Sequence, residues 1–179
     1  DFSTPTPLAY DRPPQGLADQ NDDAADHCVH LSPDLTARLT TLAQQHRVTP
    51  NTFVQGAWAI LLAYYSGERA VLFGGTVAGR PTQLLGVESV LGLFINTLPL
   101  RVSVSPEQPV LAWLKDLLAE NIRLREYEYT PLIQIQRCSE VPRGEALFHS
   151  LFVFENAPVD PALCEGRIMF RAEEEQYRV

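Results

Sequence analysis

The side chains that could do chemistry occur in small groups, and the first group has the residue types of a metal site. His27-Cys28-Val29-His30 combines imidazole and thiol ligands. On a strand, alternate side chains point to opposite faces, so His27 and Cys28 should diverge. No second cluster supplies the remaining ligands of a tetrahedral site. We therefore predict ordinary strand residues and no metal site in this segment.

A second group contains possible acid-base residues. No GxSxG elbow accompanies His149, the one histidine in the second half of the chain, so we expect it to face solvent or a neighbour. Glu126 and Glu128 alternate with Tyr127 and Tyr129 at a helix end, which is typical of a solvated face. A Ser/His/Asp triad is compatible with the composition. No segment, however, contains a complete catalytic set.

A glycine-rich stretch offers a binding loop instead. Gly74, Gly75 and Gly79 follow the apolar run 70–73, and glycine lets a backbone bend or approach a ligand closely. A second extended run, 94–104, comes after a linker. The pattern predicts two strands joined by a long loop, with the glycines where the first strand ends. Such loops are often functional, although glycines after a strand also mark simple turns.

Polar residues around this loop have two interpretations. Arg80-Pro81 follows Gly79, where a phosphate-binding loop would have Lys-Ser/Thr, so we expect no such loop. Asn96 interrupts an apolar strand, and a buried amide there needs hydrogen-bond partners. Asn96 and Arg80, with Arg101, could tie the loop together or could line a ligand channel, and the two roles are compatible.

The elements that must position these residues alternate in type. Ser32-Pro33 and Thr49-Pro50 are start signals for helices that should reach about His46 and Tyr65. Further helices are expected at 108–126 and 131–137, and further strands at 26–31, 146–154 and 166–171. The predicted order β-α-α-β-loop-β-α-α-β indicates an α/β domain, with a layered mixed sheet and flanking helices.

Apolar periodicity gives the expected core faces of three helices. The second helix lacks charge, so we expect it to be buried on most sides. The expected core residues are Leu35, Leu39 and Leu42 in the first helix, Phe53, Val54, Ala57, Trp58, Leu61, Leu62 and Tyr65 in the second, and Val110, Trp113, Leu114, Leu117, Leu118 and Ile122 in the third.

Composition narrows the possible classes of protein. The 179 residues carry a formal net charge of −8, which argues against a nucleic-acid partner. No apolar run is long enough to span a bilayer and no secretion signal is present, so we expect no membrane partner. Three separated cysteines predict free, mostly buried thiols in a reducing, cytoplasmic compartment. The chain begins at Asp1 without a methionine and looks excised from something longer.

Five segments, in order, resemble motifs of the condensation domains of nonribosomal peptide synthetases, specifically their C-terminal half. The resemblance covers nearly the whole chain. The family's LPxDRPRP-like connector, GTxVAGR, GxFVNTxxLR, EYTPLxxIQ and LFDSLFVFEN motifs match Leu8–Pro14, Gly75–Arg80, Gly92–Arg101, Glu128–Gln136 and Leu147–Asn156.

The resemblance implies one lobe of a chloramphenicol-acetyltransferase-like, two-lobed fold. Residues 1–24 would be an inter-lobe connector, and 25–179 would be a C-terminal lobe that is incomplete at its end. In the tunnel between the lobes, an acceptor amine on one carrier protein would attack the thioester of an aminoacyl or peptidyl donor on another. The residues implied for the tunnel and its floor loop are Gly75, Thr76, Gly79, Arg80, Asn96 and Thr97.

The resemblance also implies what the chain needs from elsewhere. The catalytic HHxxxDG motif is absent and belongs to the N-terminal lobe in this family, so no catalytic residue is expected in this chain, and the fragment alone should be inactive. No cofactor would bind directly, since substrates arrive on phosphopantetheine arms. The implied partners are the N-terminal lobe, peptidyl carrier proteins and adjacent synthetase domains.

Two alternatives remain open. The chain could belong to a non-catalytic, condensation-like docking module, or to an epimerisation or heterocyclisation relative. His149 stands where the family usually has Asp, which weakens any role for that position. The unaltered Asn96-Thr97 pair favours ordinary condensation.

Overall fold

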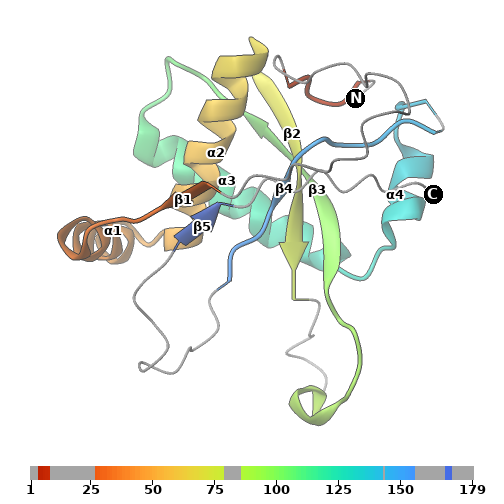
Figure 1. Ribbon diagram of the computed structural model, residues 1–179, viewed down its shortest axis with the longest axis horizontal. Coiled ribbons are helices and arrows are strands. Elements are labelled where there is room, and N and C mark those ends of the chain that lie inside the picture. The colour runs from red at the N-terminus through yellow and green to blue at the C-terminus, as the bar shows by residue number, and fades with distance from the viewer. Residues whose placement is uncertain (1–3, 9–26, 79–85, 143, 156–167, 171–179) are drawn as a thin grey trace.

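The computed structural model describes residues 4–8, 27–78, 86–142, 144–155 and 168–170. Its elements follow the predicted order (Figure 1). The helices are α1 (Pro33–His46), α2 (Pro50–Ser66), α3 (Val110–Leu124) and α4 (Leu132–Cys138), with short 3-10 turns η1 (Val87–Ser89) and η2 (Arg125–Tyr127). The strands are β1 (His27–Val29), β2 (Ala70–Val77), β3 (Asn96–Ser103), β4 (Leu151–Phe152) and β5 (Ile168–Phe170).

The central sheet is mixed and has the order β3-β2-β4. β2 and β3 are antiparallel along their whole lengths, from the pair Ala70–Ser103 to the pair Val77–Asn96. β4 is parallel to β2 through Gly74–Leu151 and Gly75–Phe152. β1 and β5 form a separate antiparallel pair. The layered mixed sheet with flanking helices that the sequence predicts is therefore confirmed.

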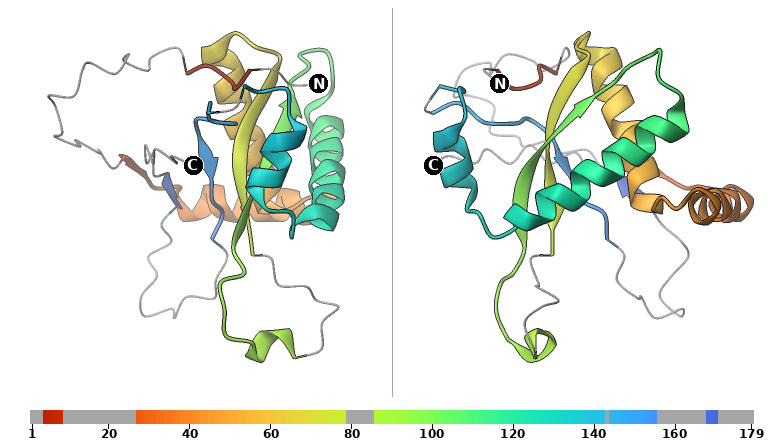
Figure 2. Two further views of the ribbon diagram at one scale, coloured as in Figure 1. Left: turned by 90° about the vertical axis from the view of Figure 1, so that its right-hand side faces the viewer. Right: turned by 180° about the vertical axis from the view of Figure 1, so that it is seen from behind.

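The two faces of β2 pack against different parts of the chain. Val71 and Phe73 lie in a cluster with side chains of α2, α3 and β3. Leu72 points to the other face, as strand alternation requires, and packs with Val141 and Leu147 and against α4. Helices α3 and α4 therefore contact opposite faces of the sheet, and the turn between them must cross the edge formed by β3 (Figure 2).

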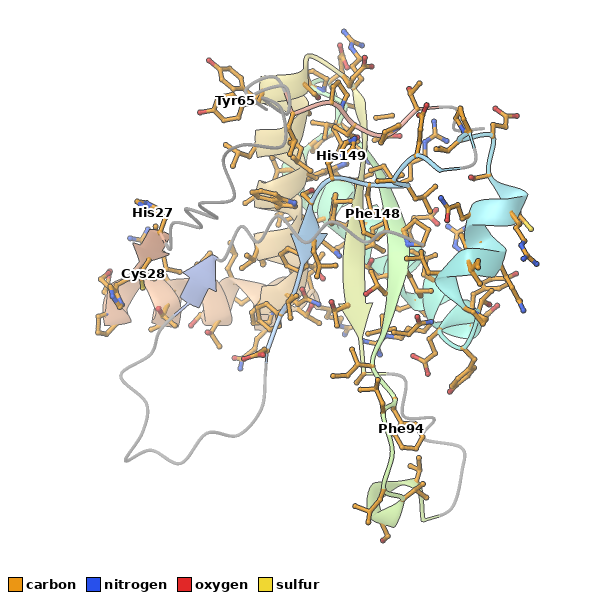
Figure 3. The ribbon with its side chains drawn as sticks, turned by 45° about the vertical axis from the view of Figure 1, so that its right-hand side comes forward. His27, Cys28, Tyr65, Phe94, Phe148 and His149 are labelled. Carbon is orange, nitrogen blue, oxygen red and sulfur yellow. The ribbon has the colours of Figure 1, made fainter. Side chains whose placement is uncertain are left out.

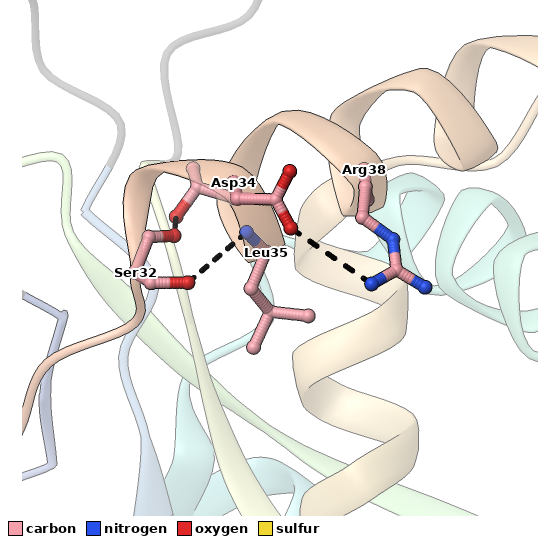
Figure 4. A network of polar contacts seen from close by, with 5 residues as sticks. Ser32, Asp34, Leu35 and Arg38 are labelled. Atoms are coloured by element: carbon pink, nitrogen blue, oxygen red, sulfur yellow. Dashed lines mark hydrogen bonds and ion pairs between the residues drawn. The ribbon is translucent and has the colours of Figure 1, made fainter.

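Capping explains where the first two helices begin. The Ser32 hydroxyl accepts a hydrogen bond from Leu35 N at 3.2 Å, and Pro33 occupies the first turn. Asp34 near the N-terminus pairs with Arg38 at 3.9 Å (Figure 4). Thr49 caps α2 in the same way through Thr52 N. Both predicted start signals are confirmed.

Strand lengths differ from the sequence prediction in two places. The first long strand does not end at its glycines, because β2 continues through Gly74 and Gly75 to Val77. A Cβ on Gly75 would collide with the Leu100 side chain, so this glycine is required by packing within the sheet. The run 146–154 contributes only Leu151–Phe152 as strand, since the preceding residues fold over β2 instead.

The second helix is not buried on most sides. Thr52 and Gln55 face inward and are buried, and Gln55 accepts a hydrogen bond from Asn121 of α3. The exposed face is apolar and contains Ala57, Ile60, Leu61, Tyr64 and Tyr65. Sequence periodicity cannot say which apolar face meets the sheet when almost the whole helix is apolar.

Other expected core positions are also more exposed than predicted. Val110 and Ile122 lie near the two ends of α3 and are exposed, and the buried residues of this helix are Trp113, Leu114 and Leu117. Leu35 on α1 is exposed, and α1 buries only Ala43.

Cys28 and Cys138 are exposed free thiols, contrary to the expectation of burial, while Cys164 lies outside the described residues. None of the described helices combines the length and apolar character needed to cross a membrane.

Candidate functional site: the arm and its root

Residues 86–95, which precede β3, project beyond the end of the sheet (Figure 2). We call this segment the arm. It contains η1 and carries some of the most exposed large apolar side chains of the described structure, with Leu91 98% and Leu93 88% exposed. Ile95 is also exposed. Figure 3 shows Phe94 on the arm, at the opposite end of the molecule from Tyr65.

The arm leaves the sheet at a pair of threonines. Thr76 of β2 is paired with Thr97 of β3, and Val77 is paired with Asn96 one step further toward the arm. Thr76, Thr97 and Asn96 are half-buried. These residues, which were predicted from different segments, are therefore brought together at the root of the arm. Gly75 lies beside them, opposite Leu98, whereas Gly79 and Arg80 fall outside the described residues.

Asn96 makes the most extensive polar contacts at this root. Its Nδ2 donates to the carbonyl oxygens of Glu128 at 2.8 Å and Thr130 at 3.0 Å. Its Oδ1 accepts from the backbone N–H of Thr97 at 2.9 Å. Both amide hydrogens are thus used within the protein, so Asn96 ties the chain together, as one of the two sequence interpretations had it.

The residues that Asn96 contacts form the turn between η2 and α4. We call residues 128–130 the crossover turn, because they lead from α3 on one face of the sheet toward α4 on the other. Sequence reasoning treated this turn and the Asn96 strand as separate motifs. The available signal was the single Asn in an apolar strand. It predicted that the side chain forms hydrogen bonds, but it could not identify the partner residues.

Within the crossover turn, Tyr129 is exposed and its hydroxyl donates to Glu128 Oε1 at 2.8 Å. Partial loss of solvation raises the pKa of the Tyr129 hydroxyl, and the hydrogen bond to Glu128 and its negative charge act in the same direction. The Glu128 carboxylate is therefore hydrogen-bonded to the adjacent Tyr129 hydroxyl. The predicted solvated face holds for Glu126 and Tyr127, which are exposed, but Glu128 is half-buried.

The remaining chemistry-bearing residues are dispersed. All three residues of β1 are exposed, and Cys28 Sγ lies 3.5 Å from His30 Nε2. Among the described residues, no group of three or more potential ligands could hold a metal ion. His149 is exposed and precedes β4 (Figure 3). Arg101 is exposed on β3, opposite Leu72.

Comparison with known proteins agrees on one family. Residues 3–178 match the family model for the condensation domain. The chain is 49% identical over 158 residues to one of the linear gramicidin synthase proteins of Brevibacillus parabrevis, covering 88% of this chain and 3% of that protein. It is 47% identical over 165 residues to chondramide synthase of Chondromyces crocatus, covering 92% of this chain and 4% of that protein. The chain thus spans only a few per cent of the curated relatives it matches.

Solved structures agree on the fold. The first condensation domain of the CDA synthetase superposes with a TM-score of 0.61 at 20% identity, covering 82% of this chain and 32% of that chain. The starter condensation domain of rhizomide synthetase also gives 0.61, at 22% identity, covering 86% of this chain and 33% of that chain. At these identities the likeness concerns the fold, and this chain corresponds to about a third of each structure.

Proposed function

This chain belongs to the condensation-domain family, and we propose that it forms the C-terminal lobe of a condensation domain in a cytoplasmic nonribosomal peptide synthetase. The lobe would form one wall and the floor of a tunnel whose other wall is the N-terminal lobe. Residues 1–24 would connect the two lobes. Three relatives at 45–50% identity are subunits of linear gramicidin synthase, and they support a peptide synthetase as the parent protein.

The proposed reaction joins two substrates that arrive on carrier proteins. The acceptor amine attacks the thioester carbonyl of the donor, the carbon–sulfur bond breaks, and the thiol of the donor's phosphopantetheine arm leaves as the amide forms. Much of the rate can come from holding two tethered reactants together and excluding water. Apolar walls with few polar groups suit this task.

The arm is the observation that carries the proposal. A loop that exposes Leu91 and Leu93 almost completely is unfavourable in water, because each apolar side chain loses the free energy of burial. Contiguous exposed apolar surface typically marks a place where another protein surface packs. We propose that the N-terminal lobe covers the arm, and that the arm then closes the floor of the tunnel. Its root residues Gly75, Thr76, Asn96 and Thr97, with Gly79 and Arg80, would border the substrate path.

In this proposal the chain supplies shape and no acid-base group. The catalytic HHxxxDG motif would come from the N-terminal lobe. We expect no amide product when the 179-residue chain alone is mixed with loaded carrier proteins, and product formation when the parent synthetase is used. Mass spectrometry of the carrier-bound product measures both. Amide formation by the isolated chain would contradict the assignment of catalysis to the other lobe.

Substitutions in the arm test its role in the parent synthetase. The double variant L91S/L93S should lower amide formation by roughly tenfold or more, because a floor that no longer packs admits water and misplaces the substrates. V110S is the matched control, since Val110 is also exposed and apolar but lies on α3 away from the arm. Equal turnover in the arm variant and the control would exclude the floor role.

The same assay separates the alternatives. A parent synthetase that forms no amide but binds another protein through this lobe would favour a docking module. Epimerised or cyclised carrier-bound products would identify the corresponding relatives.

A further inference from the structure

Asn96 lies where the arm, the sheet and the crossover turn meet. The arm ends at Ile95, and β3 begins with Asn96 itself. The crossover turn passes the same end of β3 on its way from α3 to α4. The Asn96 side chain therefore joins the start of β3, directly after the arm, to the crossover turn.

The hydrogen bonds of Asn96 have only one satisfactory arrangement. The carbonyls of Glu128 and Thr130 can only accept, so they need the amide NH2. The backbone N–H of Thr97 can only donate, so it needs Oδ1. Rotating the amide by half a turn would place its oxygen against two carbonyls. The Asn96 side chain is thus held in one orientation. Through these hydrogen bonds it also fixes the crossover turn relative to the start of β3.

The backbone alone does not supply this connection. In the antiparallel ladder, Val104 N donates to Arg69 O, so the N–H groups of even-numbered β3 residues point to β2 and those of odd-numbered residues point outward. Thr97 N–H therefore points away from β2, at the edge where the crossover turn passes. Asn96 satisfies this outward donor and bridges the edge to the turn.

We propose that Asn96 is a positioning residue, which sets the direction of the arm by fastening its root to the crossover turn. This inference rests on the proposed function, since the arm matters for chemistry only if it forms the tunnel floor. Because both amide hydrogens are engaged within the protein, the proposed role of Asn96 is exerted through the backbone that it holds. A displacement of about 1 Å at a substrate-positioning element can reduce turnover by on the order of a hundredfold.

The test uses three variants of the parent synthetase. N96A removes all three hydrogen bonds. N96D keeps the acceptor for Thr97 N–H but replaces the donors with an oxygen that faces the Glu128 and Thr130 carbonyls. N121A is the matched control, because Asn121 is also a half-buried asparagine whose side chain donates a hydrogen bond, and this bond goes to Gln55 and joins α3 to α2.

The first readout is the mobility of the arm. Chymotrypsin cleavage after Leu91, Leu93 or Phe94, identified by mass spectrometry of the new termini, reports how firmly the arm is held. We expect N96A and N96D to be cut several-fold faster than the unsubstituted protein, and N121A to be cut at the unsubstituted rate. Thermal unfolding checks that N96A and N121A lose similar stability, so that a general loss of structure is distinguished from a local release.

The second readout is amide formation. We expect kcat to fall by about tenfold or more in N96A and N96D, with little change in KM for the carrier-bound donor, because the substrates still bind but are misaligned. The control N121A should retain its turnover.

The two readouts distinguish the two hypotheses. If N96A and N96D match N121A in both cleavage and turnover, the positioning role is wrong, even if the parent forms amides normally. If the unsubstituted parent forms no amide, the proposed function fails, and the cleavage rates alone decide whether Asn96 fastens the arm.

Discussion

At the scale of single residues, Gly74 shows how closely the segment before β4 packs on one face of the sheet. A Cβ at this position would lie 2.5 Å from Phe148 Cε2 and 3.0 Å from Leu151 Cδ1. Phe148 packs against the cluster of Leu72 and Leu147, so the ring has little room to move. The glycine therefore lets the segment before β4 lie directly on the backbone of β2.

Alanine at Gly74 should destabilise the fold by about 1–3 kcal/mol, because it overpacks this contact. Chemical denaturation of the single variant measures the loss. G92A is the control, since the nearest atom to an added Cβ there is Phe94 Cε2 at 3.4 Å. The double variant G74A/F148L should recover part of the loss. A loss in G74A no larger than in G92A would contradict the tight packing.

The Tyr129 hydroxyl should ionise above the usual tyrosine pKa of about 10. Because the folded-state pKa is raised, the native state keeps its proton longer than the unfolded state. The resulting stabilisation is fully present below the unfolded pKa and is lost as pH rises through the folded pKa. NMR titration of the tyrosine ring carbons measures the value, and E128Q should lower it, since the charge of Glu128 contributes to the shift. A Tyr129 pKa that is the same in E128Q would exclude that contribution.

At the scale of elements, the N-terminal segment completes the edge of β2. Thr6 is buried, and its Oγ1 accepts a hydrogen bond from Leu72 N at 2.6 Å. β4 pairs with β2 only further along, from Gly74, so Thr6 occupies the part of this edge that β4 leaves unpaired. Leu8 packs against the main core cluster. These residues of the proposed connector thus contribute directly to the sheet.

T6V should lower the free energy of unfolding by about 1–3 kcal/mol, because it leaves the buried N–H of Leu72 without an acceptor. T4V provides the comparison, since Thr4 is exposed and the same atoms are changed. Denaturant titration of both variants measures the difference. If the two variants are equally stable, the segment does not contribute to the sheet in solution.

At the scale of the whole molecule, the described residues expose apolar surface at places that include two separate candidate interfaces. One is the arm, and the other is the outer face of α2 with Ile60, Leu61 and Tyr64. Exposed apolar faces of this kind favour association in water, because contact removes them from solvent. The 179-residue chain alone should therefore form oligomers or aggregate.

Replacing these side chains with polar residues should reduce the association. Analytical ultracentrifugation can compare the unsubstituted chain with I60Q/L61Q on α2 and with L91S/L93S on the arm. We expect each pair to shift the distribution toward monomer, and V110S to leave it unchanged. A monodisperse, stable monomer of the unsubstituted chain would argue against a large interface at either surface.

Local signals in the sequence determined much of the fold. Ser32, Thr49 and the prolines after them are sufficient to start two helices, since a cap acts on residues within one turn. The alternation of elements predicted the layered sheet, and the five motifs predicted the family. The sequence also indicated that Asn96 would need partners.

Only the tertiary structure decided which faces meet and which residues Asn96 binds. β2 continues through Gly74 and Gly75, where the side chains of Phe148 and Leu100 leave no room for a Cβ, and these two residues are distant in sequence from the glycines. Because α2 is almost uniformly apolar, its sequence gave no periodic signal for the face that points inward. Contact with α3 and the sheet determines that face. The partners of Asn96 lie more than 30 positions away, at residues 128 and 130, and only the crossing of the chain over the edge of β3 brings them into contact. Such contacts depend on how elements pack, which no local pattern of residues records.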